Sequence, residues 1–358
     1  MTDTTASGPV DVAVIKVAAL GDVVRTTSIL PGLRRRHPDM RLVWITSRQA
    51  IDLIRHHPDV HEAVAIEDLA AGGLGDRSFA WVISLDDEVE SCRLTSTIAA
   101  ARISGGYLGP DGCRRYTADT EPWFGMGRLR PQARGGLRRA NELKRENKLS
   151  HPAILYKMLG LPGPIAGPVV VIPGDKSARP REWWRGHGLH TSPAVVGVNT
   201  GAGGRWRFKK WGEEQTVELV RALHDQLGVA VVLLGGPAER ERNARILRAA
   251  ARPRTFVAPA DWSLLEFADV LRRCHVVVTS DSLALHLALA CRVPAVAFFG
   301  PTSAAEIEMF GLGEKIETPL PCRCCYLTNC EVTPNCMDTI STRVMLDAVR
   351  RWLPRRGR

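Results

Sequence analysis

A chain of 358 residues, 45% of them hydrophobic and 24% charged, has the composition of a globular protein and the length of two ordinary domains. Its apolar runs are too short to span a bilayer, and the N-terminal stretch lacks the leader pattern of a signal peptide, so we expect a cytoplasmic protein. The net charge of +10 favours anionic partners, whereas an aromatic content of 6% without a helix-turn-helix, RNP or zinc-finger pattern argues against nucleic acid.

The first hundred residues alternate between strand-like apolar runs and helix-like segments. Strands are expected at "VAVIKVAAL", "RLVWITS" and "WVISLD", and helices at residues 22–36 and 49–57. This alternation is typical of a doubly wound parallel sheet.

The same alternation resumes after residue 194. Strands are expected at "AVVGVNTG", "VAVVLLGG", "VVVTS" and "PAVAFFGPT", and helices at residues 213–227, 238–251 and 283–290. Because the intervening segment is rich in Pro and Gly, we predict two α/β domains, residues 1–185 and 186–340, that face each other across a cleft. An amphipathic helix within 341–358 ends the chain, and the sequence leaves its packing partner open.

Three predicted turns between a strand and a helix carry polar residues. In the first, "VAALGDVVRTT", Asp22 follows Gly21 at the start of a helix. A carboxylate at this position either caps the helix, which is the commoner use, or acts as a general base.

The second turn, "VNTGAGGRWRFKKW", combines small residues with cations. Thr200 and Gly201 begin a loop whose backbone amides suit a phosphate, and the four cations that follow are Arg205, Arg207, Lys209 and Lys210. Trp206, Phe208 and Trp211 alternate with these cations, so one set can pack inward while the other projects. Anion binding and a solvated basic loop are the two interpretations, and the position after a strand favours the first.

The third turn lies in "VVVTSDSLALHLALA", where Asp281, Ser282 and His286 interrupt an apolar run. Buried polar groups need partners, and the nearby sequence offers few. The amides at the start of a helix form an anion site, and His286 lies one turn further on the same face as Ser282. A ligand that supplies the missing partners and a satisfied core histidine are both compatible with this pattern.

A further carboxylate, Glu239, follows the Gly-Gly-Pro turn of "LLGGPAERE". A carboxylate after a strand of a nucleotide-binding domain holds ribose hydroxyls, and a Glu at a helix start is equally ordinary.

Five motifs, "ALGDVV", "NTGAGGRWRFKKW", "LLGGPAE", "VVTSDSLALHLA" and "VAFFGPTSAAE", follow one another in this order. As a set they resemble glycosyltransferase family nine, the ADP-heptose:lipopolysaccharide heptosyltransferases, over most of the chain, with a weaker match from about 105 to 190. The resemblance implies a GT-B fold of two Rossmann-like domains. It also implies inverting transfer of a heptose from an ADP-sugar, with no cofactor or metal required for catalysis.

Carried over by position, the resemblance makes Asp22 the base and Lys209 a contact to the donor phosphate or sugar. It also implies donor contacts from the phosphate-side residues Thr200 and Gly201, the ribose-binding Glu239, the sugar-binding Asp281, and the diphosphate turn of Ser282, Leu283, Ala284 and His286. Many members have Gly where this chain has Leu283, so the class of donor is better supported than its sugar.

The acceptor is expected to bind the N-terminal domain. Residues 114–148 contain ten Lys or Arg and four acidic residues, which suits a phosphorylated saccharide such as lipopolysaccharide core, or peripheral contact with the inner face of the cytoplasmic membrane. A solvated basic surface is the alternative. Three other functions also remain open: glycosylation of a small molecule, sugar-nucleotide epimerisation, and noncatalytic binding of a nucleotide sugar.

Five of the nine cysteines lie close together near the C-terminus. Four of them, with the spacing C-x2-C-x4-C-x5-C, are Cys322, Cys325, Cys330 and Cys336. The C-x2-C start is a usual chelate for structural zinc or an iron–sulfur cluster, but the second knuckle of a zinc ribbon is missing. A structural metal site and a thiol-rich packed loop are therefore the two interpretations.

Overall fold

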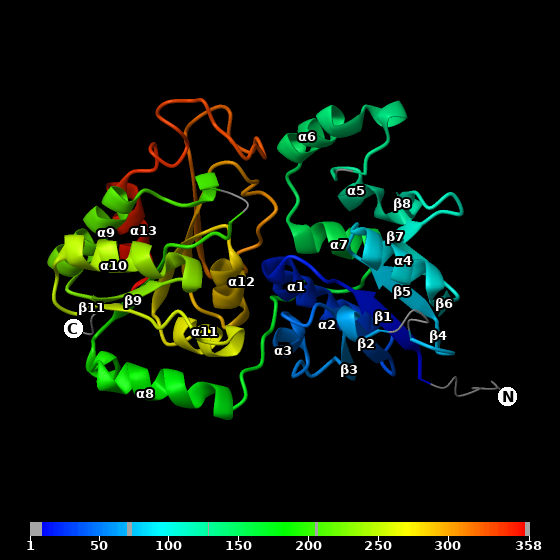
Figure 1. Ribbon diagram of the computed structural model, residues 1–358, viewed down its shortest axis with the longest axis horizontal. Coiled ribbons are helices and arrows are strands. Elements are labelled where there is room, and N and C mark those ends of the chain that lie inside the picture. The colour runs from blue at the N-terminus through cyan, green and yellow to red at the C-terminus, as the bar shows by residue number, and fades with distance from the viewer. Residues whose placement is uncertain (1–8, 70–73, 128, 205–206, 355–358) are drawn as a thin grey trace. The chain divides into compact units, whose positions relative to one another are not determined.

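The computed structural model describes residues 9–69, 74–127, 129–204 and 207–354 (Figure 1). The chain divides into two compact units, one ending at Val171 and the other beginning at Ile172. The expected boundary at residue 185 falls inside the second unit. Helix α8 (Ala178–Gly186) belongs there because it packs against α11 (Leu264–Leu271), and the hydroxyl of Ser177 donates to Asp269 of α11 at 2.9 Å.

The first unit is built on a six-stranded sheet in the order β3-β2-β1-β5-β7-β8, in which only the β7–β8 pair is antiparallel. The strands are β1 (Asp11–Ile15), β2 (Arg41–Thr46), β3 (Glu62–Ala65), β5 (Trp81–Ser84), β7 (Ile103–Leu108) and β8 (Arg114–Tyr116), and β4 (Ser78–Phe79) pairs separately with β6 (Ala99–Ala100). The helices are α1 (Leu20–Thr26), α2 (Leu30–Arg36), α3 (Ile51–Ile54), α4 (Val89–Thr97), α5 (Glu121–Phe124), α6 (Gly136–Glu146) and α7 (His151–Leu159). Strand β1 is buried at Val12–Ile15, as a central parallel strand covered on both faces must be.

The second unit repeats this arrangement with an all-parallel sheet in the order β11-β10-β9-β12-β13-β14. The strands are β9 (Val195–Asn199), β10 (Ala230–Leu234), β11 (Thr255–Val257), β12 (Val276–Ser280), β13 (Ala295–Phe299) and β14 (Gly313–Glu317). Besides α8 and α11, the helices are α9 (Glu213–Leu227), α10 (Arg240–Ala250), α12 (Leu283–Ala290) and α13 (Thr342–Trp352). The predicted α/β class with two doubly wound sheets is confirmed.

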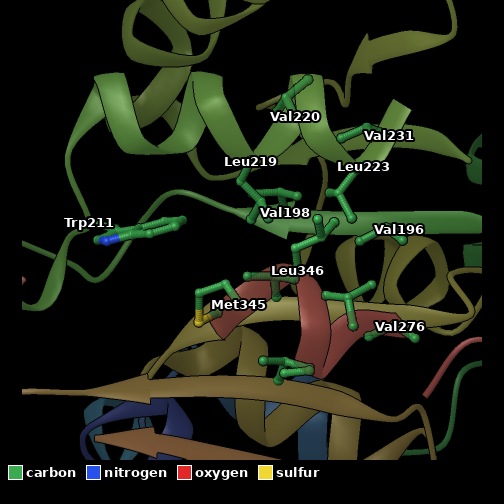
Figure 2. Packing of buried hydrophobic residues seen from close by; sticks show 14 of the residues in the cluster. Val196, Val198, Trp211, Leu219, Val220, Leu223, Val231, Val276, Met345 and Leu346 are labelled. Carbon is green, nitrogen blue, oxygen red and sulfur yellow. The ribbon is translucent and has the colours of Figure 1, made fainter. Parts of the chain in front are cut away.

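The C-terminal helix α13 is part of the second unit. It packs against α9, and its Met345 and Leu346 are buried beside valines of β9 and β12 in one hydrophobic cluster (Figure 2). Val344, on the other side of the helix, is 45% exposed. Burial of one apolar stripe, rather than helix propensity, fixes where this helix lies.

Each sheet has one point where neighbouring strands are followed by connections that leave in opposite directions. In the first sheet this switch point lies between β1 and β5, and in the second it lies between β9 and β12. Ligands of open α/β sheets bind beyond the carboxyl ends of the strands at such points, because the diverging loops leave room there. Among the described residues, no helix has both the length and the apolar character needed to cross a membrane.

Candidate functional site

The turn after β12 lies at the switch point of the second sheet. Asp281 and Ser282 form the turn, and α12 begins at Leu283, as the sequence predicts. Ser282 is the N-cap residue with φ −147° and ψ 173°, so the chain passes directly from extended to helical backbone. Half-buried Leu283 and buried Ala284 form the first turn of the helix. The start of α12 therefore lies at the carboxyl end of the sheet, where helix amides and the helix dipole favour an anion.

A cation, a carboxylate and an imidazole meet at this turn. The ammonium of Lys209 donates to Oδ2 of Asp281 at 2.7 Å and to its carbonyl oxygen at 3.0 Å. Oδ1 of Asp281 lies 3.9 Å from Nε2 of His286. The side chains of Lys209 and Asp281 are 13% and 17% exposed, so both charges are largely removed from water yet reachable. Three predicted site residues from two distant segments are thus brought together.

Asn199 connects this turn to the loop after β9. Its side-chain amide lies within donating distance of the carbonyl of Gly201 (2.8 Å) and the hydroxyls of Thr279 (3.0 Å) and Ser282 (3.2 Å). The hydroxyls of Thr279 and Ser282 are 2.9 Å apart. Asn199 therefore orients Ser282, whose side chain makes no capping bond to α12. Asn199 is not among the predicted site residues, although an amide that ends an otherwise apolar strand before a candidate phosphate loop is a usable signal.

The loop that follows β9 is supported by buried polar residues. The hydroxyl of Thr200 points inward and donates to Oδ1 of Asn243 at 2.5 Å. Oε1 of Glu239 accepts from Lys210 at 2.8 Å, and Oε2 accepts from the amide of Gly236 at 3.1 Å. Glu239 thus closes a helix start, one of the two roles considered for it, and also pairs with a cation.

Gly201 lies close to the Glu239 side chain. A Cβ at Gly201 would lie 2.8 Å from the carboxyl carbon of Glu239, closer than real side chains approach. A side chain at position 201 would therefore require the Glu239 carboxylate to shift.

Trp211 anchors the segment that carries the two lysines. Its indole N–H lies 3.1 Å from the carbonyl of Met337 and 3.2 Å from that of Ile340, and the guanidinium of Arg242 donates to the carbonyl of Trp211. Burial lowers the pKa of Arg242 from its usual value. The lysines are therefore presented by a tethered segment rather than by a loose basic loop. The predicted Arg205 and Trp206 lie outside the described residues.

The candidate base Asp22 lies in the first unit. Helix α1 begins at Leu20 with Ala19 as its N-cap residue, so Asp22 falls inside the first turn and is not the cap. Its carboxylate pairs with Arg25 at 2.9 Å, and the Arg25 guanidinium lies over the ring of Trp123 with 5.5 Å to the ring centroid. The side chain of Asp22 is 36% exposed, which leaves the carboxylate accessible to a substrate.

The basic segment 114–148 pairs many of its cations internally. Arg130 and Arg134 contact Glu121 at 2.9 and 3.2 Å, while Arg138 and Arg139 contact Glu142 at 2.7 and 3.3 Å. Position 128 lies outside the described residues. The segment includes the helices α5 and α6, and several of its cations pair with carboxylates of the same segment.

The cysteine-rich segment packs beside the turn that follows β13. The amide of Cys324 donates to the carbonyl of Gly300 at 2.9 Å, and that of Tyr326 donates to Pro301 at 2.8 Å. The Tyr326 hydroxyl donates to Glu306 at 2.7 Å, and burial together with this carboxylate raises the pKa of Tyr326 well above its usual value. The segment therefore supports the rim of the second sheet.

The four predicted thiolate ligands differ in their surroundings. Throughout the described ranges, no three His, Cys, Asp or Glu side chains are grouped as a bound metal requires. Cys336 is buried in the hydrophobic cluster, where burial raises the pKa of its thiol to about 11, whereas Cys322 is exposed. The structural zinc or iron–sulfur site, like its alternative of a thiol-rich packed loop, therefore stays a prediction.

The chain is similar to known heptosyltransferases. The model of glycosyltransferase family 9 (heptosyltransferase) matches residues 153–321. Lipopolysaccharide heptosyltransferase 1 of Pseudomonas aeruginosa is 24% identical over 348 residues, which cover 90% of this chain and 88% of that protein.

Two solved structures share the fold. A family 9 glycosyltransferase from Veillonella parvula has a TM-score of 0.72 at 18% identity, covering 96% of this chain and 97% of that one. The ADP-heptose lipopolysaccharide heptosyltransferase II of Escherichia coli has a TM-score of 0.68 at 19% identity, covering 96% and 98%. The two Rossmann-like units share the GT-B fold of that protein. Over residues 153–321 the chain matches glycosyltransferase family 9 (heptosyltransferase), and over most of its length it is similar to proteins of that family.

Proposed function

We propose that this glycosyltransferase moves a heptose, or a closely related sugar, from an ADP-sugar to a saccharide hydroxyl, with phosphorylated lipopolysaccharide inner core as the acceptor. The observation that carries the proposal is the cluster of Lys209, Asp281 and His286 at the start of α12. The names of two relatives, a lipopolysaccharide heptosyltransferase and an ADP-heptose heptosyltransferase, support the same donor and acceptor classes.

The donor binds the second unit in this proposal. The ammonium of Lys209 and the first amides of α12 neutralise the diphosphate, and the carboxylate of Asp281 accepts hydrogen bonds from sugar hydroxyls. Lys209 and Asp281 are paired with each other in the structure, so both groups exchange a partner when the donor binds. Glu239 and the loop at Thr200 and Gly201 are assigned to the ribose and phosphate side.

The chemistry is a single displacement. Asp22 removes the proton of the acceptor hydroxyl as its oxygen forms the new bond to the anomeric carbon. The bond from that carbon to the diphosphate oxygen breaks on the opposite side, so the configuration inverts and ADP leaves with the electron pair. Lys209 and the α12 dipole stabilise the negative charge that develops on the leaving diphosphate.

The acceptor is assigned to the first unit, which carries Asp22. Its surface offers α6, where Arg138 is 81% exposed, and the neighbouring Leu137 is 49% exposed. Cationic and apolar groups side by side suit a phosphorylated glycolipid at the cytoplasmic face of a membrane. We therefore propose peripheral contact with that membrane through this helix.

The experiment is a panel of nucleotide sugars, each incubated with and without inner-core or small-molecule acceptors. Release of ADP and a product mass increased by one heptose, only when donor and core acceptor are both present, are expected. Donor conversion without acceptor would instead indicate an epimerase. ADP-sugar binding without turnover under any condition would indicate a binding protein, and product with a small molecule alone would replace the proposed acceptor.

A further inference from the structure

The switch point of the first sheet is bridged by a buried ion pair. Lys16 directly follows β1, and Asp86 lies two residues after the end of β5. The Lys16 ammonium lies 2.5 Å from Oδ1 of Asp86, and the two side chains are 8% and 7% exposed. No residue discussed above contributes to this pair, and neither partner was singled out from the sequence.

Both partners also hold the main chain that leads into α1. The Lys16 ammonium donates to the carbonyl of Ala18, and the amide of Val17 donates to Oδ2 of Asp86. The amide of Lys16 itself donates to Ile45 of β2 at 3.0 Å. The main chain at residues 16–18 is therefore fixed from β2 on one side and from β5 on the other.

This clamped segment ends immediately before the helix that carries Asp22. Helix α1 begins at Leu20, and Asp22 is its third residue. Because a helix is stiff, the orientation of its first turn follows the main chain that enters it. The Asp22 carboxylate thus takes its position from the clamp, while Arg25 contacts it at the side-chain end.

Stability alone does not account for the pair. Desolvation of two charges offsets most of their attraction, and apolar replacements of similar volume are often neutral or stabilising. An ion pair that also binds two main-chain groups instead fixes one geometry. Catalysis needs such a geometry, because displacing a catalytic group by about 1 Å costs on the order of 10²-fold in rate.

We infer that Lys16 and Asp86 are positioning residues that hold the first turn of α1 so that Asp22 can act as the base. The inference rests on the proposed function. The pair does not touch substrate; it acts on the reaction through the backbone of residues 17 and 18.

The test is the neutral double variant Lys16→Met/Asp86→Asn, which leaves no unpaired buried charge. We expect kcat to fall roughly 10- to 100-fold at a temperature where the variant is folded, with the Kd for ADP unchanged. The matched control, Arg34→Met/Asp59→Asn, removes another ion pair of the first unit, 3.1 Å long, that does not contact the α1 turn. It should keep the wild-type kcat.

A second variant keeps the inference testable if the double variant does not fold. Asp86→Glu keeps both charges and lengthens the clamp by one methylene, so it should fold and lower kcat at unchanged ADP affinity. A folded variant of either kind with kcat within about twofold of wild type, a factor below the cost of misplacing a catalytic group, would overturn the inference.

The background of Asp22→Asn separates this inference from the proposed function. With the base removed, the double variant should cost less than about twofold further, because residues that act as one unit are not additive. A full further loss in that background would assign the pair to another role and overturn the inference. Normal turnover by Asp22→Asn alone would instead overturn the proposed base.

Discussion

Each of the two sheets has an ion pair at its switch point, but the two pairs differ in how far their side chains are exposed to solvent. In the first unit the pair of Lys16 and Asp86 is nearly sealed and binds its own backbone. In the second unit the pair of Lys209 and Asp281 is about twice as exposed and lies at the start of a helix. The same position in one fold can therefore hold charges that fix the scaffold or charges available to a ligand, and burial of the pair distinguishes the two uses.

This difference divides the proposed reaction between the units. The first unit presents a partly exposed carboxylate on a clamped helix, which suits proton transfer. The second presents cations and helix amides, which suit a diphosphate. Substitutions in the first unit should therefore change turnover, and substitutions in the second should change donor affinity.

The largest expected effect is that of Asp22→Asn. Loss of a general base typically lowers the rate ~10²–10⁴-fold, while the Kd for ADP should stay near that of the wild type because Asp22 does not contact the donor diphosphate in this proposal. Single-turnover product formation and calorimetric titration of ADP measure the two quantities. Wild-type turnover, or a large loss of ADP affinity, would contradict the assignment of proton transfer to the first unit and of donor binding to the second.

Lys209→Ala and Asp281→Ala should separate phosphate from sugar contacts. A charged hydrogen bond contributes about 1.5–3 kcal/mol, so Lys209→Ala should weaken ADP binding roughly 10- to 100-fold. Asp281→Ala should leave ADP affinity unchanged or raise it, because it frees the ammonium of Lys209, and should weaken binding only of the complete ADP-sugar. Equal losses of ADP affinity in both variants would contradict the assignment of Asp281 to the sugar.

Asn199 offers a matched pair of substitutions at the same switch point. Asn199→Ala removes the amide that orients Ser282. Asn199→Asp replaces this amide with a carboxylate of similar size, which adds a negative charge. If a diphosphate binds there, the Asp variant should lose several-fold more ADP affinity than the Ala variant, because like charges repel at short range. Titrations at two ionic strengths measure this difference, and identical affinities would place the diphosphate elsewhere.

The smallest expected effect is on the alkylation rates of two buried cysteines, one in each unit. Burial raises the pKa of Cys92 to about 11, with Asp87 adding to the shift, and burial raises that of Cys274 to about 12. Since the thiolate is the nucleophile, both should stay protonated at pH 9 and react slowly with iodoacetamide, while exposed Cys113 reacts quickly. Peptide mass spectrometry follows the three sites. Equal alkylation rates for Cys92 and Cys113 would show that solvent and reagent reach the interior of the first unit.

Much of the fold followed from the apolar pattern of the sequence. The helix at residues 283–290 was predicted with its observed bounds, because a β-branched strand and an all-apolar helix flank one polar turn. The strands at 103–108 and 313–317 were missed. The first contains two glycines, which are depleted in strands, and the second carries charges of both signs, which are typical of an edge strand rather than a buried one.

The ion pairs that the candidate site residues make could not be predicted from the sequence. Motif order indicated Lys209 and Asp281 separately, but their ion pair joins positions 72 residues apart, which no local pattern encodes. The bridge from Lys16 to Asp86 spans 70 residues in the same way. The cysteine spacing suggested a metal because it matches half of a known motif, while the burial of Cys336 in the hydrophobic cluster depends on tertiary packing.

Hydrogen–deuterium exchange of the full chain with and without ADP tests the central claim, that the switch point of the second sheet holds the donor nucleotide, most directly. The account predicts slower exchange in peptides that cover residues 199–204, 209–211 and 281–286, with unchanged exchange at residues 15–26. Protection confined to the first unit, or to the second unit away from the ends of β9 and β12, would contradict it.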